Sequence, residues 1–274
     1  MTELTRISTI GIMEEIVFEH VSFHYPDTTS LIFNDLSLAL SKGITTIVGQ
    51  NGTGKSTLLL LASGTLLPTS GNVYIQGVDT TQLRDEHERQ RHVSFIFQNM
   101  EFETEETIHT LLHFVYEHGF REEGNEGLIN MLIQEFELEP CLLKKTQEIS
   151  KGELQRTILA FSLLYGSRII MMDEPIFAME DSQKHRAMRF LSAFTRKENL
   201  SLYYSVHELE ISQRYSDYAL LLQPDTPPTY GSTQRVLTRE NLEQAYEVPF
   251  IFLKQKESLY REILKNPWRK HHLN

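Results

Sequence analysis

The sequence has little cysteine and no long apolar run. Its single cysteine, Cys141, excludes an internal disulfide and fits a reducing compartment, and we expect it to be a small buried thiol. No segment approaches the roughly 18 to 20 apolar residues that a membrane-spanning helix needs. Charged residues interrupt the N-terminal stretch before it could form a secretory signal: Glu3, Arg6, Glu14 and Glu15. We therefore expect a cytoplasmic protein that reaches a membrane only through a partner.

An excess of basic charge is also absent. The chain carries 26 Lys and Arg against 37 Asp and Glu, which gives a formal net charge of −11. A duplex-binding protein normally presents a basic surface that displaces counterions, so this balance argues against nucleic acid as the main partner. The 40% hydrophobic content is ordinary for a packed protein, and 274 residues suffice for one large domain, with or without an appendage.

Apolar segments separated by glycine and proline predict a mixed α/β fold. Short β-branched and aromatic runs predict strands at 16–23, 43–48, 72–76, 93–97, 169–172, 202–206 and 219–222. Residues 56–62 predict a helix, and residues 100–164 are acidic and leucine-rich with helical spacing. Prolines at 224, 227 and 228 mark a boundary. We expect a domain over 1–223 with a helical subdomain inserted at about 100–164, and a C-terminal helical appendage over 224–274.

A glycine-rich loop follows the predicted strand at 43–48 and precedes the predicted helix. Residues 49–56 satisfy the phosphate-loop pattern G-x-x-x-x-G-K-[ST], in which backbone amides point at phosphate oxygens and a Cβ would obstruct their approach. The lysine places an ammonium against the β- and γ-phosphates, and Ser56 supplies a hydroxyl for Mg²⁺. We assign nucleotide binding to Gly49, Asn51, Gly52, Thr53, Gly54, Lys55, Ser56 and Thr57.

A second strand, at 169–172, ends in two carboxylates. Strand ends in a parallel sheet converge beside the phosphate loop, so Asp173 is suited to hold the Mg²⁺ shell. Glu174, one residue further, points elsewhere and is suited to polarise the attacking water. The alternative is a strand that ends in a solvated acidic turn, which the phosphate loop in the same chain disfavours.

The segment Ile149-Ser-Lys-Gly-Glu153 lies shortly before that acidic strand. Ser150 and Glu153 form a capping box that opens an apolar helix. The segment also resembles the signature of ABC-type ATPases, most often Leu-Ser-Gly-Gly-Gln. The resemblance implies that Ser150, Gly152 and Glu153 present a helix N-terminus to the γ-phosphate held by a second subunit.

Three further residues match landmarks of the same family. Tyr25 resembles the aromatic residue that stacks on adenine, although an edge-strand aromatic is the alternative. Gln98 resembles the glutamine that senses Mg²⁺ and the γ-phosphate, and His207 the histidine that contacts the γ-phosphate. The resemblance implies catalytic roles for Glu174, His207 and Gln98, and metal contacts from Ser56, Gln98 and Asp173.

The sequence also departs from the family pattern. Lys151 replaces the first signature glycine, and we favour a side chain in solvent over one on phosphate. Ile149 and Glu153 replace the leucine and the glutamine. Glu180 stands where the loop after the acidic strand usually has aspartate. Its extra methylene puts the geometry across a dimer interface in question.

The resemblance implies a P-loop ABC-ATPase core with an antiparallel β edge subdomain and a helical insertion, using ATP and Mg²⁺. It implies a homodimer that works with integral-membrane permease subunits, peripheral on the inner face of the cell membrane. An extracytoplasmic solute-binding protein is a further candidate partner, because the separate ATPase chain resembles importers. Residues 231–248 resemble the tails of ATPases for iron-chelate, haem or cobalamin uptake.

Two alternatives from other classes stay open at this point. One is an ABC-type ATPase without a transport role, which usually carries paired ATPase units or long coiled coils. The other is a P-loop phosphotransferase, in which the segment 149–153 would have no purpose. A neighbouring permease gene, or a phosphorylated small-molecule product, would separate the three.

Overall fold

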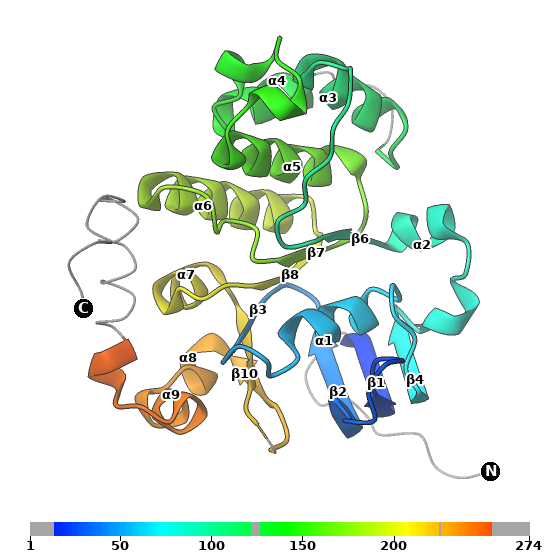
Figure 1. Cartoon of the computed structure of the whole chain (residues 1–274), viewed down its shortest axis with the longest axis vertical. Coiled ribbons are helices and arrows are strands. Elements are labelled where there is room, and N and C mark those ends of the chain that lie inside the picture. The colour runs from blue at the N-terminus through cyan, green and yellow to red at the C-terminus, as the bar shows by residue number, and fades with distance from the viewer. Residues whose placement is uncertain (1–13, 122–126, 225, 254–274) are drawn as a thin grey trace.

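The computed structural model describes residues 14–121, 127–224 and 226–253, so residues 254–274 of the expected appendage lie outside it (Figure 1). Its strands are β1 (Glu14–Phe23), β2 (Phe33–Ser41), β3 (Ile44–Gly49), β4 (Ser70–Ile75), β5 (Val78–Asp79), β6 (Val93–Ile96), β7 (Ile169–Asp173), β8 (Ser201–Ser205), β9 (Tyr218–Leu222) and β10 (Thr229–Ser232). Its α-helices are α1 (Lys55–Ala62), α2 (Glu86–His92), α3 (Ile108–Glu117), α4 (Gly127–Glu135), α5 (Lys151–Tyr165), α6 (Asp181–Lys197), α7 (Leu209–Tyr215), α8 (Thr233–Val236) and α9 (Arg239–Tyr246). The α/β prediction is confirmed.

The antiparallel sheet has the strand order β2-β1-β4-β5 and lies beside α1. In β1 the buried side chains alternate at Ile16 and Phe18 and then resume at Val21 and Phe23. The change from even to odd positions coincides with a register shift, where His20 has a left-handed φ of 51°. This bulge inserts one residue into the strand, and it thereby keeps the apolar side chains of both halves on the core side.

The main sheet has the order β10-β9-β3-β8-β7-β6, with β10 antiparallel to β9 and the other pairs parallel. Every residue of β3, β7 and β8 is buried, as expected for strands covered on both faces. Because parallel strands end at the same edge, the chain leaves β3, β6, β7 and β8 at one common edge. The phosphate loop, Gln98, Glu174 and His207 all follow these strand ends.

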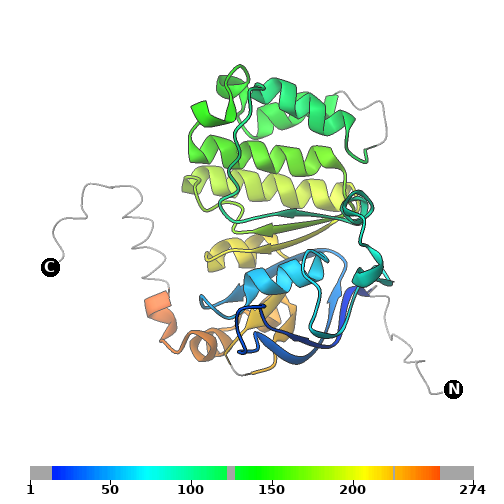
Figure 2. The ribbon, with the colours of Figure 1, turned by 45° about the vertical axis from the view of Figure 1, so that its right-hand side comes forward.

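Successive residues of the central strands point into different cores. In β7, Ile169 and Met171 pack with α1 and the antiparallel sheet, whereas Ile170 and Met172 pack with α3, α4, α5 and α6. These four helices form a helical layer on one side of the main sheet that is more than one helix deep, with α6 nearest the strands, α5 beyond it and α3 and α4 outermost (Figures 1 and 2). Cys141 is fully buried in that layer, as expected, and burial raises the pKa of its thiol.

The C-terminal tail begins as a strand, which corrects the expectation of a purely helical appendage. β10 pairs with β9 from Thr229↔Leu221 to Ser232↔Tyr218, so the expected boundary at residue 224 falls within a hairpin of the main sheet. A short edge strand that follows two prolines has little sequence signal of its own. The helices α8 and α9 then pack on Val48 of β3 and on β9.

None of the helices in the described part of the chain combines the length and apolar character needed to cross a membrane.

Candidate active site

The glycine-rich loop joins the end of β3 to the start of α1. Gly52 (φ 84°) and Gly54 (φ 92°) have left-handed conformations that residues with a Cβ rarely adopt. Gly49 is required for a steric reason, because a Cβ there would lie 2.6 Å from the carbonyl oxygen of Leu222. Gly54 is the N-cap of α1, so the first amides of that helix face the loop. This loop is shaped to hold an anion at a helix N-terminus.

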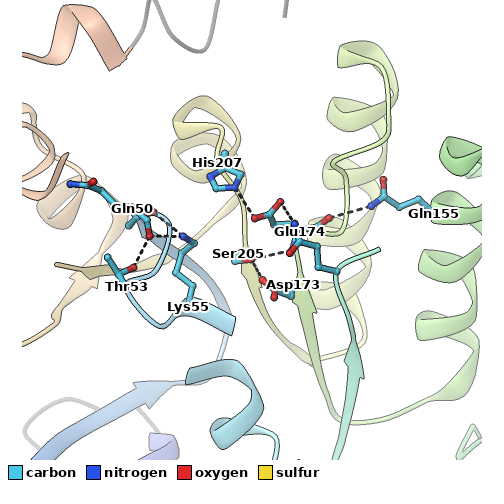
Figure 3. Close-up of polar contacts among 10 residues, drawn as sticks. Gln50, Thr53, Lys55, Gln155, Asp173, Glu174, Ser205 and His207 are labelled. Atoms are coloured by element: carbon cyan, nitrogen blue, oxygen red, sulfur yellow. Dashed lines mark hydrogen bonds and ion pairs between the residues drawn. The ribbon is translucent and has the colours of Figure 1, made fainter. Parts of the chain in front are cut away.

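Lys55 is almost fully buried at the first position of α1. Its Nζ donates hydrogen bonds of 2.9 Å to the carbonyl oxygens of Gly49 and Gln50 (Figure 3). Burial lowers the pKa of Lys55, while the negative charges of Glu174 and Asp173 act in the opposite direction. The ammonium therefore lies inside the loop and within the electrostatic reach of both carboxylates.

The other assigned residues lie in the loop, in the first turn of α1 and just after β1. Thr53 Oγ1 donates a 2.9 Å hydrogen bond to the Gln50 carbonyl. The Tyr25 hydroxyl lies 3.0 Å from Thr57 Oγ1, and its half-exposed ring meets Phe23 edge-on. The structure thus brings Tyr25 to the first turn of α1. The side chains of two other assigned residues are exposed beside the loop: Asn51 and Ser56.

The two acidic residues at the end of β7 share one serine, Asp173 through its carboxylate and Glu174 through its backbone amide. Ser205 Oγ donates to Asp173 Oδ1 and accepts a 3.0 Å hydrogen bond from the Glu174 amide. Asp173 is 6% exposed and Glu174 has a left-handed φ of 49°, which turns its side chain away from the strand direction. A left-handed conformation is uncommon for a non-glycine residue and costs free energy. The contacts around Glu174 must therefore hold it in this conformation.

The Glu174 side chain is held from two other loops. Its Oε1 lies 2.7 Å from His207 Nε2, and its Oε2 accepts a 2.9 Å hydrogen bond from Gln98 Nε2. Burial raises the pKa of Glu174, but hydrogen bonds from His207 and Gln98 and the positive charges of His207 and Lys55 outweigh it and hold the pKa below its ordinary value. An ionised carboxylate therefore sits at the common edge of β6, β7 and β8.

The helix α5 begins with the expected capping box. Ser150 Oγ accepts from the Glu153 amide at 3.2 Å, and Glu153 Oε2 accepts from the Ser150 amide at 2.8 Å. Hydrogen bonds from Ser150 lower the pKa of Glu153. A Cβ on Gly152 would lie 3.0 Å from the carbonyl oxygen of Ala178, so this position requires close backbone approach. Lys151 is largely exposed and pairs with Glu101 at 2.8 Å.

The phosphate loop, the acidic strand end and the capped helix match one family in sequence as well. The sequence pattern of the ABC transporter family matches residues 33–177, which is more than half of the chain. This chain belongs to the ABC transporter family. It is an ABC-type ATP hydrolase, as the motifs predicted.

Curated relatives of this ABC ATPase include import ATP-binding proteins. The molybdenum import ATP-binding protein ModC of Saccharophagus degradans is 29% identical over 201 residues, or 72% of this chain and 55% of ModC. The chain thus spans about half of ModC. The iron(3+)-hydroxamate import ATP-binding protein FhuC of Bacillus subtilis is 24% identical, over 86% of this chain and 89% of FhuC.

Solved ABC structures show the same fold. An ATP-binding subunit of an ABC transporter superposes with a TM-score of 0.73 at 20% identity, covering 89% of this chain and 99% of that one. The dimeric ATP-binding cassette MJ0796 in a post-hydrolysis state with ADP and Pi gives 0.69 at 19% identity, covering 80% and 98%.

Within the ABC chain, the signature helix stays apart from the phosphate loop. Figure 3 shows Lys55 on one side of Glu174 and Gln155, from α5, on the other. Among the described residues, no hydrogen bond or ion pair joins Ser150, Gly152 or Glu153 to residues 49–57. One protomer therefore brings Lys55, Asp173, Glu174, Gln98 and His207 together but not the signature residues.

Two residues of the ABC site were not found from the sequence. Ser205 joins the Asp173 carboxylate to the backbone amide of Glu174, and its only signal is a polar residue at the end of a buried strand. Gln155 Nε2 donates to the Glu174 carbonyl at 3.2 Å, and its Oε1 accepts from the Ala178 amide at 2.8 Å. It therefore ties the signature helix to the loop that follows Glu174, a contact between segments that the sequence alone does not place together.

Proposed function

We propose that this ABC ATPase powers the transport of a solute through separate membrane permease subunits, in the direction of import. The observation that carries the proposal is the ionised Glu174, held between Gln98 and His207 beside the buried Lys55. The import functions named for ModC and FhuC support the direction. For cargo we propose an iron chelate, haem, cobalamin or a metal ion.

The triphosphate occupies the glycine loop in this proposal. The loop amides and the N-terminus of α1 bind phosphate oxygens, and the Lys55 ammonium leaves its carbonyl partners for them. The Tyr25 ring supplies a face for adenine, because its hydroxyl is anchored on Thr57 at the base of the loop.

The donor set beside the loop fits Mg²⁺. The Asp173 carboxylate, the exposed Ser56 hydroxyl and the Gln98 amide oxygen are the hard oxygen ligands that this ion prefers. When bound there, Mg²⁺ neutralises charge on the β- and γ-phosphates. Ser205 fixes the Asp173 carboxylate in advance through its hydrogen bond to Oδ1.

Glu174 orients and polarises the attacking water in this mechanism. Its lowered pKa keeps the carboxylate ionised near neutral pH, and His207 and Gln98 fix its two oxygens. His207, with a side chain that is 44% exposed, would also contact the γ-phosphate in this proposal. The left-handed backbone at Glu174 turns the chain at the end of β7, where the side chain lies between His207 and Gln98.

A second copy of the chain completes the site in this proposal. The capped N-terminus of α5, with Ser150 and Gly152, lies apart from its own phosphate loop and is free to face a partner's. The dimer of MJ0796 with ADP and Pi is a fold relative that assembles in pairs. Hydrolysis then removes the phosphate contact shared by both copies, which shifts the population toward the open state.

The outer part of the helical layer, without α6, is the proposed permease-facing part. We assign the helical subdomain to about residues 100–164 within a domain of residues 1–223, and its groove to residues 100–148. Gln98 leads directly into this segment, so a permease contact there connects to Glu174 through a single side chain. A peripheral position on the inner membrane face, through the permease, and an extracytoplasmic solute-binding protein complete the proposed assembly.

Co-purification tests the proposal. The chain is expressed with the permease encoded beside it, and ATP hydrolysis is measured with each candidate solute. We expect stoichiometric capture and solute-stimulated phosphate release, and loss of release but not of capture in Lys55→Ala. Phosphate release that neither permease nor solute alters would favour an ABC ATPase without a transport role.

A further inference from the structure

Gln50 joins the C-terminal helix to the phosphate loop. Its Nε2 donates a 2.9 Å hydrogen bond to the carbonyl oxygen of Ala245, in the last turn of α9. Carbonyls in the last turn of a helix lack an intrahelical partner, so this bond satisfies an acceptor that the helix leaves open. Two segments almost 200 residues apart in the sequence therefore meet at the second residue of the phosphate loop.

The same residue organises the inside of the loop with its main chain. The Gln50 carbonyl oxygen accepts 2.9 Å hydrogen bonds from Lys55 Nζ and from Thr53 Oγ1. A displacement of Gln50 would therefore move the acceptors of both side chains. Its side chain reaches outward to α9 and its carbonyl reaches inward to Lys55, so a single residue connects the tail with the phosphate-binding lysine.

The helix α9 is held in place by buried side chains and by capping hydrogen bonds. Its buried Leu242 and Ala245 pack in one cluster with Val48, which directly precedes Gly49. The Thr238 hydroxyl caps the helix at the Asn241 amide, and Asn241 Nδ2 donates a 2.9 Å hydrogen bond to the Val236 carbonyl. The tip of the loop lacks comparable packing, since a Cβ at Gly52 would meet no atom within 4 Å.

We propose that α9 positions the phosphate loop for nucleotide through Gln50. The inference rests on the proposed nucleotide site, and it gives the tail a role in that site. A glycine loop pays conformational entropy when it is ordered around phosphate, and the bond to α9 restricts the loop beforehand. Because the support acts on the loop backbone rather than on the γ-phosphate, it acts equally on ATP and ADP.

Gln50→Met in the full chain tests the role of the donor. Methionine keeps the length of the side chain but cannot donate to Ala245. From the loss of one neutral hydrogen bond we expect the Kd of ATP and of ADP, measured by calorimetry, to rise by about two- to tenfold. The KM for ATP should rise with kcat unchanged, which is the pattern for binding lost equally in ground and transition states. Gln244→Met, the same substitution at an exposed position of α9, is the matched control and should change neither constant.

A double-mutant cycle separates this role from general loosening of the fold. Ala245→Gly loosens the residue that offers the carbonyl, and it should weaken nucleotide binding in the wild-type background but not in Gln50→Met. Unchanged Kd values in Gln50→Met, or additive effects in the cycle, would overturn the inference. Failure of the wild-type chain to bind nucleotide, by contrast, would overturn the proposed site as well, and Lys55→Ala provides the reference for lost binding.

Discussion

At the residue scale, the chemistry depends on how Glu174 is held. A carboxylate at the end of a buried strand is common, and the sequence predicted this one from its place after residues 169–172. It did not predict that Ser205 joins the Asp173 carboxylate to the Glu174 amide, or that Gln155 holds the Glu174 carbonyl. Those contacts join strands and helices that are distant in the chain. A single polar residue forms no sequence pattern from which such a contact could be predicted.

Glu174→Gln should abolish turnover and keep nucleotide binding. The amide can still contact Gln98 and His207 but is a far weaker base, so we expect phosphate release to fall by about 10²- to 10⁴-fold. Calorimetry should give an ATP Kd close to that of the wild type. Glu240→Gln, on the outer side of α9, is the control and should hydrolyse normally. Wild-type turnover in Glu174→Gln would show that another group activates the water.

The pH dependence of stability should also report on Glu174. Burial raises the pKa of this carboxyl, but the groups around it outweigh burial, so the folded pKa lies below the ordinary value of 4.5. A depressed folded pKa contributes stability that is present above the unfolded pKa and is lost as the pH falls through the folded pKa. Acidification below pH 4.5 should therefore lower the Tm of the wild type more than it lowers the Tm of Glu174→Gln. A difference that stays constant between pH 7 and the acid range would contradict the assigned pKa direction.

At the element scale, the sequence predicted what a repeating pattern or a motif marks. The buried strands at 44–49, 169–173 and 201–205 are short apolar runs, and the capping box at Ser150 marked the start of α5. It missed β2, whose burial does not alternate regularly, and β10, which pairs only at the sheet edge. Such strands are specified by the neighbour they pair with, and a neighbour is not visible in a local pattern.

A buried ion pair between α6 and the start of α7 should be important for stability. Lys184 Nζ pairs with Glu208, which directly follows His207, and their side chains are only 7% and 22% exposed. Removing one partner leaves the other charge poorly solvated, so Lys184→Met should lower the free energy of unfolding by about 3 kcal/mol. The double variant Lys184→Met, Glu208→Leu should recover most of that loss in urea unfolding.

The control for the ion pair is Lys197→Met. Lys197 lies in the exposed last turn of α6, so its replacement should cost less than about 1 kcal/mol. An equal loss of unfolding free energy in Lys184→Met and Lys197→Met would mean that the contact between Lys184 and Glu208 does not stabilise the fold.

At the scale of the whole molecule, the proposed site has two halves that do not meet within one protomer. The phosphate loop and Lys55 lie on one side of Glu174, and α5 with its signature residues lies on the other (Figure 3). The phosphate loop follows β3 and Glu174 follows β7, two strands whose residues are all buried. We propose that a second copy closes the site, rather than a rearrangement inside one chain.

The structure of the Glu174→Gln chain loaded with ATP and Mg²⁺ is the most direct test of this account. We predict a symmetric dimer in which Ser150 Oγ and the Gly152 amide of each protomer lie within hydrogen-bond distance of the γ-phosphate bound at the partner subunit's Lys55. A dimer that binds ATP in its glycine loops while Ser150 stays far from every phosphate would contradict it.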